Sequence, residues 1–405
     1  MKRLFFIFSL LFLSSAMIAQ QFEAPKLKGS NFTKVKVKIG ADFAMQYQAI
    51  SCTADSALVP LGKGVNLPEA NLNIGAILAP GIQVHLTVYL SSKHHLDTWV
   101  KGGYLLVDEL PFIKGMNKIM KNITIKVGTM EINYGDAHFL RSDNGNIIRN
   151  PFIGNYIMDA FTTAPAAELM FRKNGFILMG GVSTGSLKPS LVNYGYGTYT
   201  PQSSLKQLAF YGKVGFDKQI NPDFRVRVTL SGYHCKKNSF GTLYDGNRSG
   251  SRFNLVMVPQ TNSSSDVNPS SNPFTGRWGP GFTNKDNDLM LFTLIDYKGL
   301  EFIGTYEKAK GTTAFGGANF DFTQYVGALT YRFGNVKQYY VGSRYNKVFN
   351  DNNQKVSRVE AGLGWFLTKN ILVKAVYVNQ KYSNFSQYGN NAGFKGVTLE
   401  AGVSF

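Results

Sequence analysis

The sequence predicts an all-β protein, namely a transmembrane, antiparallel, up-and-down β-barrel of about sixteen strands with a third loop that folds inward. Three observations support this prediction. Segments that alternate apolar and polar residues recur along the chain, as expected of strands with one apolar face. The connections between these segments are alternately short and long. The chain ends in such a segment on a bare aromatic residue, Phe405, whereas the termini of soluble domains usually fray into water.

The N-terminus has the layout of a secretory signal peptide. A charged start and an apolar run over residues 4–13 precede a cluster of small residues. The run is too short for a permanent membrane helix, and cleavage after either Ala16 or Ala19 fits the pattern. We therefore expect a signal peptide over 1–19 and an outer-membrane barrel over 20–405.

The composition excludes a helical membrane protein but not a barrel. Beyond the signal peptide no stretch is long and apolar enough for a membrane helix, and the mean hydropathy is −0.12. A barrel strand needs only one apolar face. The sequence contains 42 glycines, 31 phenylalanines and 21 tyrosines, and aromatic residues are enriched in strands.

The charge indicates the class of binding partner, and the cysteines bear on disulfides and metal sites. A formal net charge of +18 indicates anionic partners, and for a membrane barrel we expect lipid, lipopolysaccharide and small anionic or neutral solutes, with no nucleic acid. Cys52 and Cys235 lie far apart in the sequence, so two unrelated thiols and a disulfide between loops both fit. The sequence matches no zinc motif, and we expect no cofactor and no metal.

The first predicted strand, 33–48, places apolar residues at odd positions and Lys34, Lys36 and Lys38 at even positions. The last, 394–405, alternates without a break from Val397 and looks like the closing strand of an outer-membrane barrel. The predicted strands are 33–48, 71–78, 82–91, 99–109, 121–130, 166–172, 176–183, 207–217, 224–235, 289–297, 300–307, 322–333, 336–349, 355–367, 371–381 and 394–405.

The connections between the predicted strands fall into two classes. Those after even-numbered strands are mostly tight turns in which glycine or asparagine supplies a positive φ, at 79–81, 173–175, 298–299, 334–335 and 368–370. Short periplasmic turns and long external loops are typical of an outer-membrane barrel. The one long connection on the short side, 110–120, is a candidate for a brief helix. The long connections are 49–70, 131–163, 184–206, 236–288 and 308–321.

Aromatic residues of outward parity lie near the short turns. Such a girdle is typical of the membrane interface, whereas aromatic residues of a soluble core would not be confined to strand ends. The residues are Phe216, Phe224, Tyr331, Phe333, Tyr339, Trp365 and Phe405.

With the apolar parity taken as outward, the opposite parity carries more bases than acids. A barrel of sixteen strands is wide enough for an aqueous channel, and basic rings favour anions. Two interpretations stay open: a weak preference for anions, or charges that keep the wall solvated and pair with inward acids. The predicted inward acids are Asp42, Glu168, Asp217, Glu301, Glu307, Glu360 and Glu400. The predicted pore-lining bases are Lys34, Lys36, Lys38, Lys126, Arg172, Lys213, Arg225, Arg227, Arg332, Arg344, Arg358 and Lys374.

The connection between the fifth and sixth predicted strands is rich in charged and large apolar residues, which suggests that it packs inside the barrel. Its candidate constriction residues are Asp136, His138, Arg141, Asp143 and Arg149. It is the third long loop, and in this it resembles the porin families, whose third loop narrows the pore. The block KVGTMEINYGD at 126–136 resembles a porin-like family of Gram-negative Bacteroidota, distantly akin to phosphate-selective porins. The dense arginine ladder of a phosphate channel is absent.

Two further motifs fit ordinary structure better than chemistry. The G-x-S-x-G pattern at 181–185 needs a strand, an elbow and a helix to place a nucleophile, but a proline and a tyrosine-glycine loop follow it. The oxygen-rich stretches 143–146 and 286–288 do not fit an EF-hand and are expected to be turns. We therefore predict no catalytic residues and no enzyme.

The sequence thus predicts a porin-like outer-membrane channel for diffusion of small hydrophilic solutes, with a weak preference for anions. A homotrimer is a candidate assembly. The first alternative is a plugged barrel that serves adhesion, structure or a transport complex, and the second is an outer-membrane hydrolase.

Overall fold

The computed structural model describes residues 20–29, 32–90, 98–185, 192–195, 198–201, 208–236, 243–244, 251–260, 274–282, 284–312 and 319–405. The predicted signal peptide lies outside these residues and stays a prediction. The barrel strands are β1 (Lys36–Thr53), β2 (Gly64–Ala79), β3 (Ile82–Leu90), β4 (Trp99–Val107), β5 (Ile123–Glu131), β6 (Thr163–Lys173), β7 (Phe176–Ser183), β10 (Ala209–Asn221), β11 (Phe224–Cys235), β14 (Asp286–Tyr297), β15 (Leu300–Thr312), β16 (Asn319–Phe333), β17 (Tyr339–Asn350), β18 (Lys355–Thr368), β19 (Ile371–Ser383) and β20 (Ala392–Ser404).

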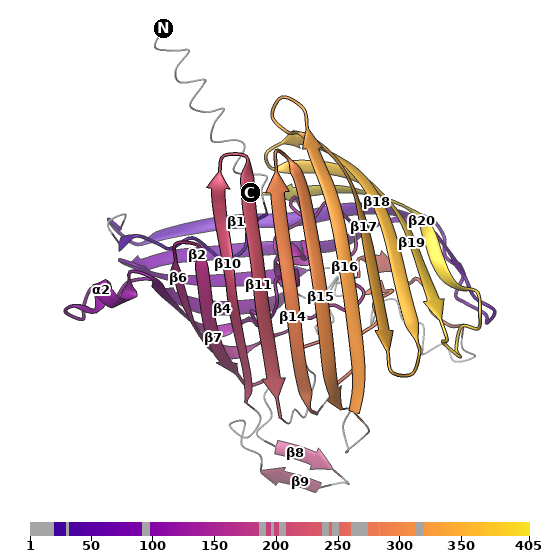
Figure 1. Ribbon diagram of the computed structural model, residues 1–405, viewed down its shortest axis with the longest axis horizontal. Coiled ribbons are helices and arrows are strands. Elements are labelled where there is room, and N and C mark those ends of the chain that lie inside the picture. Colours follow the sequence, from indigo (N-terminus) through magenta and orange to yellow (C-terminus); the bar gives the residue numbers. More distant parts are fainter. Residues whose placement is uncertain are drawn as a thin grey trace.

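These sixteen strands form one closed antiparallel barrel in chain order (Figure 1). The last strand closes on the first, with Asp42 opposite Ser404 and Thr53 opposite Gly393. The predicted fold class, strand number and strand order are therefore confirmed. Closure leaves no unpaired sheet edge, as a wall exposed to lipid requires.

Several strand ends differ from the prediction. β1 and β2 extend into the expected loop 49–70, so that the connection is only 54–63. β17 begins at Tyr339 rather than at 336, because the turn after β16 runs on through Lys337, which has a positive φ of 54°. The stretch 286–288 lies in β14 and is not a turn.

Smaller elements occupy the connections. The brief helix expected in 110–120 is present as α2 (Met116–Met120). The segment after β5 contains the 3₁₀ turns η4 (Ala137–Leu140) and η5 (Ser142–Asn144). Two short two-stranded sheets lie outside the barrel sheet: β8 (Val192–Gly195) with β9 (Thr198–Pro201), and β12 (Phe253–Asn254) with β13 (Phe274–Thr275).

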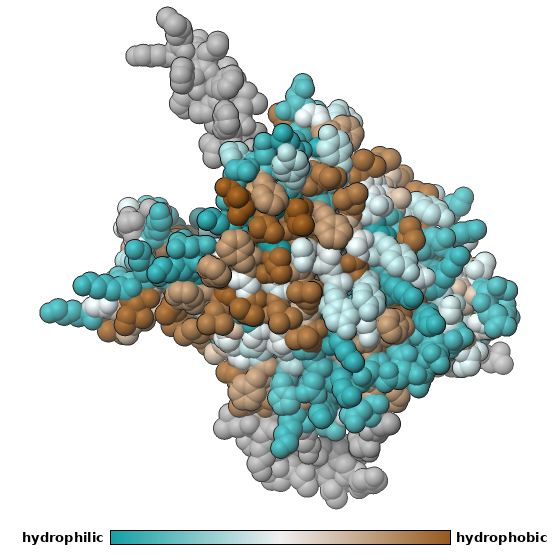
Figure 2. Space-filling view, in the orientation of Figure 1, coloured by the Kyte–Doolittle hydropathy of each residue, from teal (hydrophilic) through white to brown (hydrophobic). Residues whose placement is uncertain are grey.

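Burial alternates along the strands with the parity that the sequence indicates. In β18, Arg358 and Glu360 are buried, whereas Val359 and Leu363 are exposed on the outer face. Figure 2 shows apolar side chains gathered over the outer wall at β10–β16, with hydrophilic side chains below them toward the long-loop end. An arginine or lysine at mid-bilayer on this face would cost about 2–4 kcal/mol.

The short-turn end of the barrel carries the predicted aromatic residues. Tyr331, Phe333, Tyr339 and Trp365 are exposed and form a row whose successive ring centroids lie 6.0, 5.7 and 6.1 Å apart. Figure 1 places the C-terminus at this end and the β8–β9 hairpin at the opposite one. The exposed row agrees with an interfacial girdle.

Three further findings concern the described residues. Cys52 and Cys235 are free thiols and do not pair. No helix in the described part of the chain is long and apolar enough to cross a membrane. The described residues also contain no group of three or more histidine, cysteine and acidic side chains able to hold a metal ion.

Candidate functional site in the barrel interior

Three segments that are not barrel strands contact the inward side chains of the wall. We call residues 132–162 the inner loop, residues 20–29 the N-terminal segment, and residues 251–260 with 274–282 the cap segments. Nearly all side chains of the inner loop are buried, among them Phe152, Ile153, Ile157 and Met158. These contacts identify the inward residues that hold chain segments and those that face open space.

The inner loop is attached to β10 and β11 through Asp136. Its carboxylate accepts hydrogen bonds from Lys213 Nζ at 2.6 Å, Arg227 Nε at 2.7 Å and Thr229 Oγ1 at 2.7 Å. Burial opposes the charge of Asp136, yet Lys213 and Arg227 outweigh it and hold the pKa of this carboxyl well below its usual range. Two predicted pore-lining bases and one predicted constriction residue therefore form one buried ion cluster.

The opposite wall holds the inner loop by its backbone carbonyls. Lys374 Nζ donates to the carbonyls of Asn150 and Phe152 at 3.0 Å. Arg358 Nη1 donates to the Asn155 carbonyl at 2.6 Å. Arg344 donates to the Gly154 carbonyl and pairs with Glu360. These bases satisfy loop carbonyls that would otherwise be buried without a partner.

The other predicted constriction residues are mostly paired within the inner loop. Arg141 pairs with Asp143 at 2.8 Å and also with Asp159, and it lies 4.0 Å from the Phe161 ring centroid. Burial lowers the pKa of Arg141, but the two aspartates outweigh it and raise the pKa above its usual range.

His138 is a further predicted constriction residue that has partners. Its Nδ1 contacts Glu131 at 2.6 Å, and its Nε2 contacts Asn133 at 3.0 Å. Arg149 differs from the other constriction residues, because its Nε is buried and has no hydrogen-bond partner among the described residues.

The N-terminal segment docks against the same cluster from the other side. The Glu23 carboxylate accepts from Arg227 Nη1 and Nη2 at 2.8 and 2.7 Å. The Phe22 ring lies 4.0 Å from the Arg227 guanidinium and edge-on to Phe139 at 5.6 Å. The Arg225 Nη1 atom donates to the Gln20 carbonyl at 2.7 Å. The segment thus fills part of the interior beside β11.

The cap segments contact β1, β2 and β20. Arg252 pairs with Glu69 at 2.7 Å and also with Glu400. Gln48 and Asn254 exchange hydrogen bonds at 2.9 and 2.7 Å. The Trp278 amide donates to the Ile157 carbonyl at 3.0 Å, which joins the cap segments to the inner loop.

The remaining predicted pore-lining bases lie apart from these attachments. Lys34, Lys36 and Lys38 are exposed at the short-turn end, before the point where β1 starts to pair with β20. Arg332 lies 5.7 Å from the Tyr340 ring centroid. Lys126 lies 4.3 Å from the Tyr104 ring centroid.

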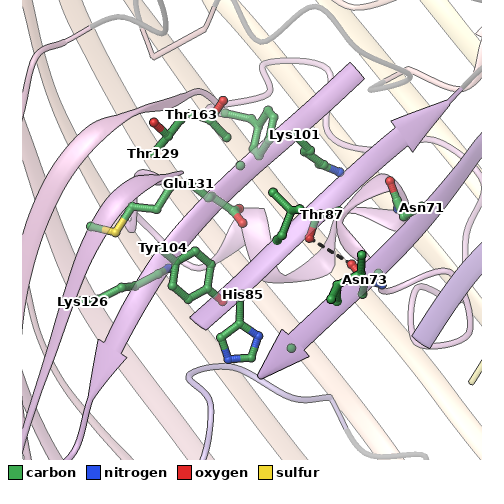
Figure 3. A pocket seen from close by; sticks show the side chains of 17 residues that line it. Asn71, Asn73, His85, Thr87, Lys101, Tyr104, Lys126, Thr129, Glu131 and Thr163 are labelled. Atoms are coloured by element: carbon green, nitrogen blue, oxygen red, sulfur yellow. Dashed lines mark hydrogen bonds between the residues drawn. The ribbon is translucent and has the colours of Figure 1, made fainter. Parts of the chain in front are cut away.

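Three cavities lie along the β2–β7 side of the barrel. A cavity of about 280 Å³ is lined by Lys101, Tyr104, Lys126 and Glu131, and Figure 3 shows these side chains with His85 below Tyr104. A second cavity, of about 330 Å³, shares Tyr104, Lys126 and Glu131 with the first.

A third cavity, of about 490 Å³, shares residues 21–25 and Arg172 with the second. It reaches the short turn at 173–175. The three cavities adjoin in series along one wall, next to the inner loop and the N-terminal segment.

Comparison with proteins of known structure identifies the fold. The fold is that of the outer-membrane porins. The chain is similar to the anion-selective porin from Comamonas acidovorans, with a TM-score of 0.57 and 11% identity over 92% of this chain and 100% of that one. It is similar to OprB of Pseudomonas putida, with a TM-score of 0.53 and 9% identity over 91% and 94% of the two chains.

A trimer form of OmpT, an outer membrane protein of Vibrio cholerae, aligns with a TM-score of 0.53 and 11% identity over 92% and 100% of the two chains. No family model matches the sequence, and no curated protein matches it. The predicted resemblance to porins therefore holds for the fold. The predicted location agrees with this fold, which is that of outer-membrane proteins of Gram-negative bacteria.

Sequence reasoning missed four side chains that shape the interior. Glu23 and Phe22 lie in a segment without strand alternation, and Arg252 lies in a long loop, so no local pattern marks them. Lys101 could have been found, because it has inward parity in a predicted strand, but the alternation there is poor.

Proposed function

We propose that this protein is a porin-like channel of the outer membrane, through which small hydrophilic solutes diffuse with a weak preference for anions. The series of adjoining cavities inside a closed barrel is the observation that carries this proposal. A pathway lined by polar residues lets solutes cross without entering lipid.

The inner loop supports the predicted constriction. It occupies the interior between β10–β11 and β17–β19, so that solutes are left the space along β2–β7. In this proposal Asp136, Arg141 and Asp143 hold the loop in place, and His138 and Arg149 border the pathway.

The proposed sign of the preference rests on the basic residues that face the cavities, since positive groups in a narrow pore favour anions. Lys126, Arg149 and Arg172 line the second cavity, together with Glu23, Glu131 and Glu168. A solved structure of similar fold belongs to an anion-selective porin. Lipid, lipopolysaccharide and a homotrimeric assembly are the partners that this function implies, and one solved neighbour is described as a trimer form.

Single-channel recording in a planar bilayer tests the proposal. Purified barrel should give steady conductance steps, and the reversal potential in a potassium chloride gradient should lie toward the chloride equilibrium potential. Steps with a reversal potential toward potassium would remove the anion preference. An absence of steps would remove the channel function.

A plugged barrel is the second candidate, and the dense interior favours it. The inner loop, the N-terminal segment and the cap segments together contact side chains on most of the wall. Such a barrel would give no conductance steps and would serve adhesion or a transport complex.

Hydrolase activity has less support. Ser183 ends β7, and its hydroxyl accepts a hydrogen bond from the Gly185 amide at 3.1 Å. Release of fatty acid from lipid vesicles is the measurement that would revive this alternative.

A further inference from the structure

We infer that the outer wall at the long-loop end of β17–β20 binds the phosphorylated saccharide headgroup of a glycolipid in the outer leaflet. This face lies outside the barrel, so the inference is independent of the channel function. Figure 1 shows the four strands side by side in the wall. Their outward side chains at this end include four lysines, one from each strand: Lys347, Lys355, Lys381 and Lys395.

The register of the strands brings the four lysines together in one patch. Lys347 lies opposite Ser357, and Ser357 lies opposite Lys381 on its other side. One row across three strands therefore carries two lysines whose Cα atoms are about 10 Å apart. Lys355 and Lys395 occupy the neighbouring rows on either side of it. Lys347 is half-buried and the other three are exposed, so the ammonium groups share one contiguous outer face.

Acids do not neutralise this patch. The outward positions of β17–β20 and of β1 carry no aspartate or glutamate. None of the four lysines forms an ion pair with another described residue, whereas Lys308 and Lys310 on β15 both pair with Asp321. Two acids lie in the adjacent connections: Asp55 and Asp351 accept hydrogen bonds from backbone amides at 2.8 and 3.1 Å. The face keeps an excess of positive charge, which attracts anions.

A crevice of about 430 Å³ adjoins the lysines on the side toward β1, and Lys381 and Lys395 line it. Gly393 occupies the outward position between Lys381 and Thr53 and adds no side chain there. Amides and hydroxyls can pair with the hydroxyl groups of a saccharide, and ammonium groups pair with phosphate. The neutral polar side chains of the crevice are those of Thr53, Asn379, Ser383, Asn390 and Asn391.

Apolar side chains continue this face toward the short turns. Val359, Tyr377 and Val397 are exposed and lie next to the lysines along β18, β19 and β20. An amphiphile whose chains lie on this surface therefore places its headgroup at the patch. The long loops of outer-membrane barrels face the cell exterior, so the patch lies in the outer leaflet. A phosphorylated glycolipid fits better than a phospholipid, because a glycerol headgroup would leave the polar crevice unfilled.

Binding of bisphosphorylated lipid A to the folded barrel in detergent micelles tests the inference, with native mass spectrometry as the readout. Folding of each protein is checked by its heat-dependent mobility on a gel. The site variant is Lys347→Gln/Lys355→Gln/Lys381→Gln/Lys395→Gln. The matched control removes the same charge from exposed lysines at the short turns and is Lys173→Gln/Lys298→Gln/Lys337→Gln/Lys369→Gln.

Wild type and control should bind lipid A equally. The site variant should bind it on the order of 100-fold more weakly, because each lysine near a phosphate surface contributes about fivefold. Added salt should weaken binding to wild type, since exposed charges are screened. Phosphatidylglycerol, which has a phosphate but no saccharide, should bind wild type more weakly than lipid A. Any conductance should be the same in the site variant and wild type, because these lysines face away from the interior.

The outcomes separate this inference from the channel proposal. Equal affinity of the site variant and the control for lipid A would overturn the site. Equal affinity of wild type for phosphatidylglycerol and lipid A would overturn the glycolipid as its ligand. A changed oligomeric state in the site variant with unchanged lipid A binding would also overturn the inference and make the face a contact between copies. An absence of conductance steps in folded wild type would remove the channel but leave the lipid site standing.

A smaller variant keeps the test decisive if the quadruple variant does not fold. Lys381→Gln/Lys395→Gln removes only the two lysines that line the crevice. Lys173→Gln/Lys337→Gln is its control, and a loss of lipid A affinity confined to the crevice variant is the expected result.

Discussion

Replacing Glu23 by glutamine should release the N-terminal segment from the barrel interior. The side chain of Glu23 is 6% exposed, and it accepts two hydrogen bonds from Arg227 at 2.8 and 2.7 Å. Glutamine keeps the shape of the side chain but removes the charge. Arg227 retains Asp136 and Asp217 as partners, so the inner loop should keep its attachment.

The size of the effect follows from these two contacts. A hydrogen bond to a charged group contributes about 1.5–3 kcal/mol, and glutamine can still accept one weaker bond. We therefore expect a loss of about 2–3 kcal/mol in docking free energy. This corresponds to an increase of about 30- to 150-fold in the undocked population.

Limited proteolysis measures this population. Trypsin cleaves after Lys26, whose Nζ donates to the Ile123 carbonyl at 2.5 Å in the docked state. When docking is fast relative to cleavage, the cleavage rate follows the undocked fraction. The rate in Glu23→Gln should therefore rise about 30- to 150-fold over wild type. Gln21→Ala is the matched control, because Gln21 is exposed and should leave the rate unchanged.

The same contact should depend on pH. Burial opposes the charge of Glu23, yet Arg227 and Lys213 outweigh it and lower the pKa of this carboxyl below its usual range. Its contribution to docking is therefore complete above the unfolded pKa of about 4.3 and is lost as the pH falls through the lower folded pKa. Conductance steps should grow in strong acid and stay constant between pH 6 and pH 8. Equal cleavage of wild type and Glu23→Gln would refute this account of the N-terminal segment.

Two further predictions concern the stability of the barrel, measured by urea unfolding in detergent micelles. Asp136→Asn should lower the free energy of unfolding by about 3–5 kcal/mol, because it leaves two buried cations short of a counter-charge. Asp223→Asn, in an exposed turn, should have no effect, and equal losses in both would contradict the proposed role of the ion cluster. Ala361→Arg, on the outer face of the middle of β18, should cost about 2–4 kcal/mol in lipid vesicles. Val336→Arg, at the short turn, should cost at most about 1 kcal/mol. A larger cost for Val336→Arg than for Ala361→Arg would contradict this position of the membrane.

The sequence by itself determined the barrel. Lipid imposes a local rule, since each residue of a spanning strand faces either hydrocarbon or the interior. The sequence therefore has a period of two in segments such as 355–367. It also has short turns on one side, as at 298–299, where Lys298 and Gly299 have φ angles of 52° and 90°. The strand order then follows because neighbours in the chain pair.

Only the tertiary structure decided which inward charges hold segments and which face open space. Lys213 and Arg358 have the same parity and the same sign, but the first pairs with Asp136, 77 residues away, and the second binds the Asn155 carbonyl, 203 residues away. A polar interior accepts any hydrophilic side chain, so it imposes no sequence period by which such partners could be found. For the same reason the docking of Glu23 against Arg227, 204 residues along the chain, is visible only in three dimensions.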